Sequence, residues 1–166
     1  MRGFARAVAT VGWIGLIRPA PGTWGSLAAL PLAWAVHWAA GLPGLVLGIL
    51  VVTLAGWWAV AEAARGLADP DASEFVIDEV AGQWIALLPV SAGAWARGLD
   101  PLALWPGIVA AFVLFRLFDI WKPGPIGRAD RMGTPWGVMA DDLLAGVAAA
   151  LGVVLLAVLA HGVMGW

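Results

Sequence analysis

Cysteine is absent from this chain of 166 residues, and tyrosine is absent with it. Without a thiol the protein forms no disulfide, holds no metal through thiolates and has no cysteine nucleophile. Charged residues are also scarce, at 12% of the chain, whereas soluble domains average about 25%. The net charge of −2 offers no electrostatic attraction for nucleic acid. These absences exclude thiol chemistry and give no support to a nucleic-acid partner.

Apolar residues dominate the rest of the chain. They make up 62% of it, with 12 tryptophans, whereas soluble domains are about 45–50% apolar. At the N-terminus, Arg2 and Arg6 precede an apolar run over 7–17, as in a signal peptide. Arg18 interrupts that run and no small-residue cleavage site follows, so we expect the segment to belong to the mature protein. The composition indicates a membrane protein.

The charged residues leave long stretches of the chain uncharged. These stretches are 19–61, 80–96, 101–115 and 143–166. A helix needs about 20 apolar residues to cross a bilayer, so the first stretch has room for two passes with a break near 41–44. The two middle stretches are short and predict tilted spans or helices that only partly enter the lipid. We therefore predict an all-α, polytopic helical membrane protein, with about four to five hydrophobic helices in one bundle and a single domain over 1–166.

The basic residues predict the orientation of these helices. Lys and Arg cluster before residue 19, at Arg65 and within 116–131, and such clusters stay on the cytoplasmic side. The N-terminus and the loops 62–79 and 116–142 are then cytoplasmic, and Arg97 and the C-terminus face outward. Carboxylates and cations of the two loops would meet on one membrane face, at the depth of the lipid headgroups.

The first acidic motif is "DASEFVIDEV" at 71–80. A helix that begins near Ser73 would place Asp78 and Gly82 one turn apart on one face. A glycine beside a carboxylate leaves room for another chain, an ion or a phosphate. Asp78 and Glu79 have a simpler interpretation as acids that favour a helix N-terminus through its dipole, with Ser73 as the cap.

A second motif, "FRLFDIWKPGPIGRADR", covers 115–131. Arg116 and Asp119 are neighbours on a helix face, and Lys122 precedes a proline, so the helix should end near Trp121. Arginine and lysine both suit phosphate oxygens, and Arg131 in the following loop is a further candidate. A basic loop that binds anionic headgroups would explain Arg131 equally well, but it does not explain Asp119 among apolar residues.

Asp141 and Asp142 precede the last uncharged stretch. They have an interpretation as dipole partners at the start of the last helix. Adjacent carboxylates repel one another, however, and usually require a cation; Mg²⁺ takes oxygen ligands and often bridges to a substrate phosphate. The acidic motifs on one membrane face therefore predict one Mg²⁺ site. Its candidate ligands are Asp78, Glu79, Asp119, Asp141 and Asp142.

Hydroxyl residues and histidines supply a few further candidates. Thr23 and Ser26 precede an apolar run, and free amides at a helix N-terminus bind anions, so both are candidates for phosphate binding. Ser26 has an equally good interpretation as a helix cap. His37 and His161 are expected to be core or interface histidines.

If the site binds a phosphate, the motifs of the sequence limit which class of phosphatase it can belong to. The D-x-D spacing of haloacid-dehalogenase-type phosphatases occurs only at 69–71, without an apolar strand. The K-x6-R-P box of histidine-dependent lipid phosphatases and the D-G-x2-A-R motif of CDP-alcohol phosphotransferases are missing. Metal-dependent hydrolysis remains, with carboxylates that hold Mg²⁺ and an activated water. An aspartyl-phosphate intermediate also stays open.

Four sequence blocks resemble the phosphatidylglycerophosphatase A family of bacterial phospholipid phosphatases. They are "PGTWGSLAALPLAW", "VIDEVAGQW", "FRLFDIWKPGPI" and "GVMADDLLAG". The blocks are similar to the family's P-G-T-x-G-S, D-E-x-x-G-x-W, F-R-x-F-D-x-x-K-P-x-P-I and G-x-M-x-D-D-x-x-A-G blocks, in the same order over 21–146. The chain departs from the family where Ala72 replaces a frequent proline and where Gly127 stands before Arg128.

The resemblance implies an activity and roles for residues. It implies Mg²⁺-dependent hydrolysis of the phosphate monoester of phosphatidylglycerophosphate, in phospholipid biosynthesis, on the cytoplasmic face of the bacterial inner membrane. Arg116 and Lys122 would hold the phosphate. The catalytic candidates are Asp78, Glu79, Asp119 and Asp142, and Asp141 joins them in the metal site. Two alternatives stay open: a non-enzymatic small membrane protein that binds anionic lipid or a partner, and a phosphatase for another lipid phosphate monoester.

Overall fold

The computed structural model describes residues 1–65 and 72–164, and every regular element in these two ranges is a helix. The predicted all-α class is therefore confirmed for the described residues. The D-x-D spacing at 69–71 lies outside them. The elements are α1 (Arg2–Ala9), η1 (Ile14–Leu16), α2 (Pro21–Ala63), α3 (Ile77–Ala86), α4 (Leu88–Arg97), η2 (Pro101–Leu104), α5 (Trp105–Trp121), α6 (Pro125–Asp130) and α7 (Pro135–Met164).

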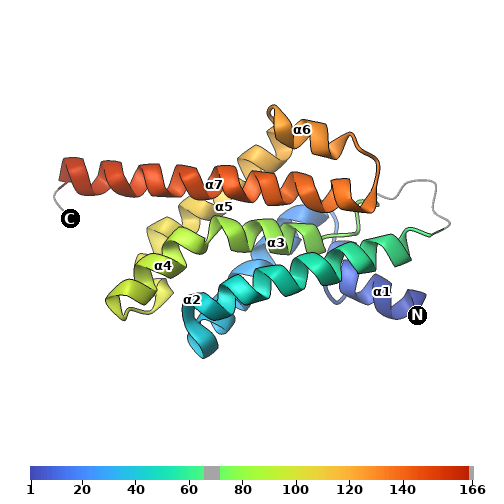
Figure 1. The fold of residues 1–166 in the computed structure, drawn as a ribbon, viewed down its shortest axis with the longest axis horizontal. Coiled ribbons are helices and arrows are strands. Elements are labelled where there is room, and N and C mark those ends of the chain that lie inside the picture. The colour runs from blue at the N-terminus through green and yellow to red at the C-terminus, as the bar shows by residue number, and fades with distance from the viewer. Residues whose placement is uncertain (66–71, 165–166) are drawn as a thin grey trace.

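Helix α2 folds back on itself at Gly41, where the break near 41–44 was predicted. Gly41 has φ 63° and ψ −159°, a conformation that glycine adopts far more readily than other residues. A Cβ built on Gly44 would lie 3.4 Å from the Val36 carbonyl oxygen, although residues eight apart in a straight helix are about 12 Å apart. The chain therefore reverses, and Figure 1 shows the two arms of α2 side by side.

Among the described residues, three helical segments are long and apolar enough to cross a membrane. They are Pro21–Ala63, Pro101–Trp121 and Pro135–Gly162. Of the two predictions for 80–96, a single tilted span is not found, because the stretch is divided between α3 and α4. Each of these has 10 residues, about 15 Å of helix, which is half the thickness of the hydrocarbon core.

Helix α3 lies at the centre of the bundle because small residues let its neighbours approach (Figure 1). A Cβ on Gly82 would lie 2.5 Å from both the Asp142 carbonyl oxygen and the Phe115 ring, and a Cβ on Gly146 would collide with the Gly82 carbonyl. Trp84 adds a hydrogen bond of 2.9 Å from its indole nitrogen to the Ala29 carbonyl. Close contacts between small residues are typical of helix packing in membranes.

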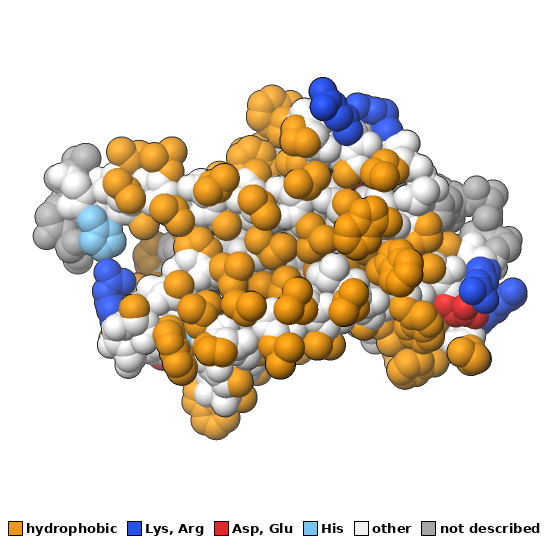
Figure 2. Space-filling model, viewed as in Figure 1, with side chains coloured by type: hydrophobic (Ala, Val, Ile, Leu, Met, Phe, Trp, Pro, Cys, Tyr) orange, Lys and Arg blue, Asp and Glu red, His pale blue; other side chains and the backbone are white. Residues whose placement is uncertain are grey.

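The outer surface of the bundle is apolar. Leu54, Ile120 and Leu151 are each about two-thirds exposed. Figure 2 shows hydrophobic side chains over the middle of the visible face, with charged ones toward its two ends and at its upper edge. Soluble monomers rarely expose apolar patches of this extent. The surface agrees with a membrane protein.

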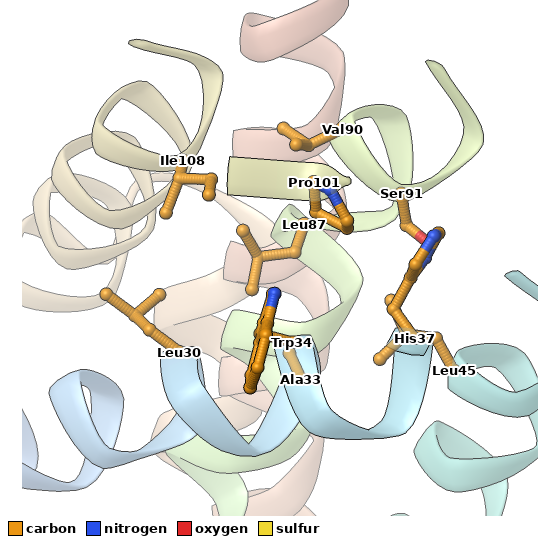
Figure 3. Close-up of a pocket in the computed structure, with 10 residues that line it drawn as sticks. All are labelled: Leu30, Ala33, Trp34, His37, Leu45, Leu87, Val90, Ser91, Pro101 and Ile108. Carbon is orange, nitrogen blue, oxygen red and sulfur yellow. The ribbon is translucent and has the colours of Figure 1, made fainter. Parts of the chain in front are cut away.

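A small cavity lies between the first arm of α2, α4 and η2 (Figure 3). His37 Nδ1 and Ser91 Oγ are hydrogen-bonded there at 2.7 Å, and both side chains are buried. The predicted interior position of His37 is thus confirmed. His161 is not in the core, since it is exposed and its Nδ1 donates to the Ala157 carbonyl of its own helix.

Candidate active site

Arg116 is the centre of a cluster of charges at one end of the bundle. Its Nη1 lies 2.6 Å from Asp119 Oδ2 and 3.5 Å from Glu79 Oε1, and it donates to Ser26 Oγ at 3.4 Å. The side chains of Arg116, Glu79 and Asp119 are only 15%, 14% and 12% exposed. The predicted i, i+3 pair within α5 is confirmed, and the structure adds partners from α2 and α3.

Lys122 supplies a second cation beside the first. As predicted, α5 ends at Trp121, and Lys122 follows in the left-handed conformation at φ 49°. Its Nζ binds the carboxylates of Asp130 and Asp141, the latter at 2.5 Å. Burial acts to lower the pKa of Lys122, but these two hydrogen bonds outweigh it and raise the pKa above its ordinary value. Lys122 is therefore a permanent cation.

Two glycines allow α2 to reach the Glu79 carboxylate. A Cβ on Gly22 would collide with Glu79 Oε1 and would lie 3.2 Å from Arg116 Nη1, and a Cβ on Gly25 would lie 2.7 Å from Glu79 Oε2. The two glycines of the P-G-T-x-G-S block therefore leave the space in which the Glu79 carboxylate lies. The sequence interpretation missed this role because it considered the hydroxyl groups of the block.

The alternative interpretation of Ser26 as a helix cap is wrong, whereas the phosphate-binding roles of Ser26 and Thr23 stay predictions. Helix α2 begins at Pro21 with Ala20 as the N-cap residue, so Ser26 lies in the second turn and is no cap. Its hydroxyl donates to the Gly22 carbonyl at 2.9 Å. The Thr23 amide is not free, because it donates to the Ala20 carbonyl. Among the described residues, Ser26 forms a hydrogen bond with Arg116 and Thr23 does not.

The carboxylates of the site are buried close together. Asp78, Asp119, Asp141 and Asp142 are each less than 10% exposed. Asp142 experiences the negative charges of Asp119, Asp78, Glu79 and Asp141. Among the described residues, Asp142 Oδ2 and Glu79 Oε2 are buried without a hydrogen-bond partner. The site thus holds more negative charge than Arg116 and Lys122 balance, and buried charge without a partner is costly.

Glu79 is an acid of the site whose pKa is strongly shifted by its burial. It lies on α3, outside the candidate spans. Burial raises the pKa of Glu79 from 4.5 to about 8, with Asp119 adding to the effect and Arg116 opposing it. The free protein therefore keeps a proton on Glu79 at neutral pH.

The five predicted metal ligands are not assembled into one set. Within 1–65 and 72–164, no group of three or more His, Asp or Glu side chains is placed to hold a metal ion. Arg116 pairs with Asp119, and Lys122 pairs with Asp141. The partnerless oxygens of Glu79 and Asp142 nevertheless suit a hard cation such as Mg²⁺. The donor set therefore fits the ion, although cations of the chain itself hold part of it.

The comparisons with known proteins decide the family. The family model described as phosphatidylglycerophosphatase A matches residues 7–157. The chain belongs to the phosphatidylglycerophosphatase A family. Every residue of the charged cluster lies within the matched range. No solved structure matches the chain.

Members of the phosphatidylglycerophosphatase A family from two bacteria align with most of this chain. The Haemophilus influenzae protein is 35% identical over 138 residues, which cover 82% of this chain and 78% of that protein. The Escherichia coli protein is 33% identical over 144 residues, which cover 82% and 73%. A Bacteroides thetaiotaomicron protein, provisionally named a phosphatidylinositol-3-phosphatase, is 36% identical over 132 residues, which cover 77% of each chain.

The acidic pairs of this family member lie at different points of their helices. Helix α3 begins at Ile77 and not near Ser73, which accepts a hydrogen bond from Arg18 instead. Asp78 and Glu79 therefore lie in the first turn, where the dipole favours acids. Helix α7 begins at Pro135, about 9 Å before Asp141. The interpretation of Asp141 and Asp142 as dipole partners is therefore wrong, since that effect is confined to the first turn.

Asp130 and Arg131, near α6, differ in whether they bind a residue of the charged cluster. Asp130 binds Lys122, which the sequence interpretation missed because the contact depends on how α6 folds back. Arg131, predicted to bind phosphate, is exposed beside Gly127. The described part of the chain shows no ion pair between Arg131 and a carboxylate of the cluster. Arg116 and Lys122 are thus the cations that the structure brings to the site.

Proposed function

We propose that this chain hydrolyses the phosphate monoester of phosphatidylglycerophosphate, giving phosphatidylglycerol and inorganic phosphate. The observation that carries the proposal is the buried cluster of Arg116 and Lys122 with partnerless carboxylate oxygens, at one end of an apolar bundle. A lipid phosphate reaches such a site at the headgroup plane while its acyl chains stay in the bilayer. Family membership supports the reaction, and we extend it to one domain over 1–166.

Arg116 and Lys122 bind the phosphate in this proposal. The planar fork of arginine matches two phosphate oxygens, and lysine adds a compact charge. In the free protein, Asp119 neutralises Arg116 and Asp141 neutralises Lys122. Asp119 also fixes the guanidinium on α5, so that it need not reorganise when the substrate arrives. The Ser26 hydroxyl, already in contact with Arg116, is a further donor to the phosphate.

The carboxylates hold Mg²⁺ and move a proton. Glu79 and Asp142 present the partnerless oxygens, with Asp119 and Asp141 beside them as further ligands. Bound Mg²⁺ supplies phosphoryl polarisation and a more acidic water. Asp78, whose Oδ1 accepts the Glu79 amide N–H at 3.0 Å, takes a proton from the attacking water. The water oxygen forms a bond to phosphorus as the phosphorus–oxygen bond to glycerol breaks, and Asp78 returns this proton to the glycerol oxygen.

The site faces the cytoplasm in this proposal, in the inner membrane of a bacterium. Helix α1 carries Arg2 and Arg6, and Arg6 binds Glu74 just before α3. Arg128 lies on α6, next to the loop that holds Lys122. Excess basic residues stay on the cytoplasmic side, which supports this orientation.

A second candidate is a phosphatase for another lipid phosphate monoester, which the name of the Bacteroides relative favours. Phosphate release by the purified, detergent-solubilised protein separates the candidates. We expect the highest kcat/KM for phosphatidylglycerophosphate, against phosphatidic acid and phosphatidylinositol 3-phosphate, and loss of turnover in excess chelator. Preference for another monoester would favour the second candidate. Binding of all three lipids without release from any would identify a non-enzymatic binder.

A further inference from the structure

Two cavities outside the charged cluster differ greatly in size. The cavity beside His37 and Ser91 has a volume of about 30 Å³, enough for one or two water molecules. An open groove among α5, α6 and α7 has a volume of about 360 Å³, within the roughly 300–1,000 Å³ of small-molecule sites. The groove is therefore large enough for a ligand and the His37 cavity is not.

The walls of the groove are apolar. Phe118, Pro123 and Ile126 form one wall, at the end of α5 and the start of α6, and Leu144, Val147 and Leu151 of α7 contribute the other. The residues that line it are otherwise alanine, glycine and proline. Such a surface offers no hydrogen bond or charge, so its ligand is a hydrocarbon group.

One end of the groove is continuous with the charged cluster. Pro123 follows Lys122 directly, and Leu144 lies one turn after Asp141 on α7. Lys122 and Asp141 are themselves 2.5 Å apart, so both walls begin at this ion pair. From Leu144 to Leu151 the groove follows a candidate membrane span for about 10 Å. It leads from the headgroup plane into the hydrocarbon region.

We infer that this groove binds an acyl chain of the lipid whose phosphate is held by Arg116 and Lys122. The inference rests on the proposed function and adds the position of the acyl chain of the bound lipid. The exposure of the α7 wall rises from 38% at Leu144 through 46% at Val147 to 67% at Leu151. The groove therefore encloses the acyl chain most tightly in its first part, next to the headgroup.

The groove acts by positioning more than by affinity. An acyl chain that moves from bilayer lipid into the groove stays in apolar surroundings, so it gains little hydrophobic free energy. The confined chain instead directs its own phosphate toward Lys122, which raises the effective concentration of the reacting group. We therefore expect groove substitutions to affect lipid substrates and to spare a phosphate monoester without acyl chains.

Substitution of Val147→Trp fills the groove, and Val46→Trp is the matched control. Val46 lies on α2, is 44% exposed and does not line the groove. We expect V147W to lower kcat/KM for long-chain phosphatidylglycerophosphate at least fivefold, with V46W near wild type. Both variants should hydrolyse glycerophosphoglycerol phosphate, which has no acyl chain, at the wild-type rate. Equal effects of V147W and V46W on the lipid substrate would overturn the inference.

A binding measurement tests the groove without turnover. Phosphatidic acid with a photoreactive group on its acyl chain is cross-linked to the wild-type protein, and the modified peptides are mapped by mass spectrometry. We expect modification in 123–126 and 144–151, lost in V147W and kept in V46W. Uniform modification of exposed α5 and α7 positions, or protein–protein cross-links through the groove, would overturn the inference. Groove labelling by this probe, together with no phosphate release from phosphatidylglycerophosphate, would support the groove and reject the proposed hydrolysis.

Discussion

The Arg116 guanidinium lies 2.6 Å from Asp119 on its own helix and 3.5 Å from Glu79 on α3. The first contact is local, because residues three apart share a helix face. The second joins segments that are 37 residues apart in the chain. Together they fix a largely buried cation between two acids. A buried cation of this kind is well placed to receive a phosphate in exchange for its carboxylate partners.

Substitution of Arg116→Lys should lower kcat/KM by about 100-fold or more. Lysine keeps the charge but loses the planar fork that binds two oxygens at once, and about 2.7 kcal/mol of lost transition-state stabilisation is a factor of 100. Steady-state phosphate release measures the change. Arg97→Lys, at an exposed position on α4, is the control and should keep wild-type kinetics. A kcat/KM within threefold of wild type for R116K would argue against a forked contact with the phosphate.

Asp141→Asn and Asp142→Asn should both lose most turnover but should differ in stability. A neutral amide binds a hard cation poorly, so kcat should fall by orders of magnitude in both. D142N removes a buried charge whose Oδ2 has no partner among the described residues, so its melting temperature should stay or rise. D141N removes a partner of Lys122, at a cost of about 1–3 kcal/mol. Measurements of melting temperature and kcat on the same samples test both expectations. A near-normal kcat in both variants would remove these residues from the metal site.

Glu79 should make the chelator-treated protein less stable as pH rises. Its pKa is about 8 in the folded protein and 4.5 ordinarily. Between these values the folded state binds more protons than the unfolded state, so the free energy of unfolding falls with rising pH. Urea unfolding from pH 6.5 to 8.5 measures the slope, and Glu79→Gln should reduce it. Saturating Mg²⁺ should also flatten it, because a bound cation favours the carboxylate. A slope that is the same in E79Q and in the wild-type protein would assign it to another group.

Gly22→Ala should reduce kcat/KM at least tenfold. The added Cβ would collide with Glu79 Oε1 and crowd Arg116, which displaces both groups. Alanine is otherwise the better helix former by about 1 kcal/mol, so stability should fall little. Gly3→Ala in α1 meets nothing within 4 Å and serves as the control, with unchanged kinetics. If G22A and G3A behave alike in both assays, the close approach of α2 to Glu79 has no catalytic role.

Cysteine labelling should place the site on the cytoplasmic face. The chain has no cysteine, so single substitutions report their own position. Ser73→Cys and Arg128→Cys, both exposed, should react with a membrane-impermeant reagent only after the cells are opened. Ala96→Cys, exposed near the end of α4, should react in intact cells. Labelling of positions 73 and 128 from opposite sides of the membrane would contradict a shared site.

Local features of the sequence determined much of the fold. The uncharged stretches gave the apolar helices, since a long run without charge suits lipid. Gly41 marked the reversal of α2, because few other residues adopt its conformation readily. Pro123 marked the end of α5 at Trp121. The Arg116–Asp119 pair followed from helical spacing alone.

Only the tertiary structure decided the partners between helices. Glu79 meets Arg116, Lys122 meets Asp141, and Gly22 faces Glu79. The starts of α3 and α7 were also misjudged, by four residues near Ser73 and by six before Asp141. Helical spacing relates residues within a turn or two, whereas these partners depend on how closely separate helices approach. That approach is set by contacts such as Gly82 against Gly146, which have no signature within either helix alone.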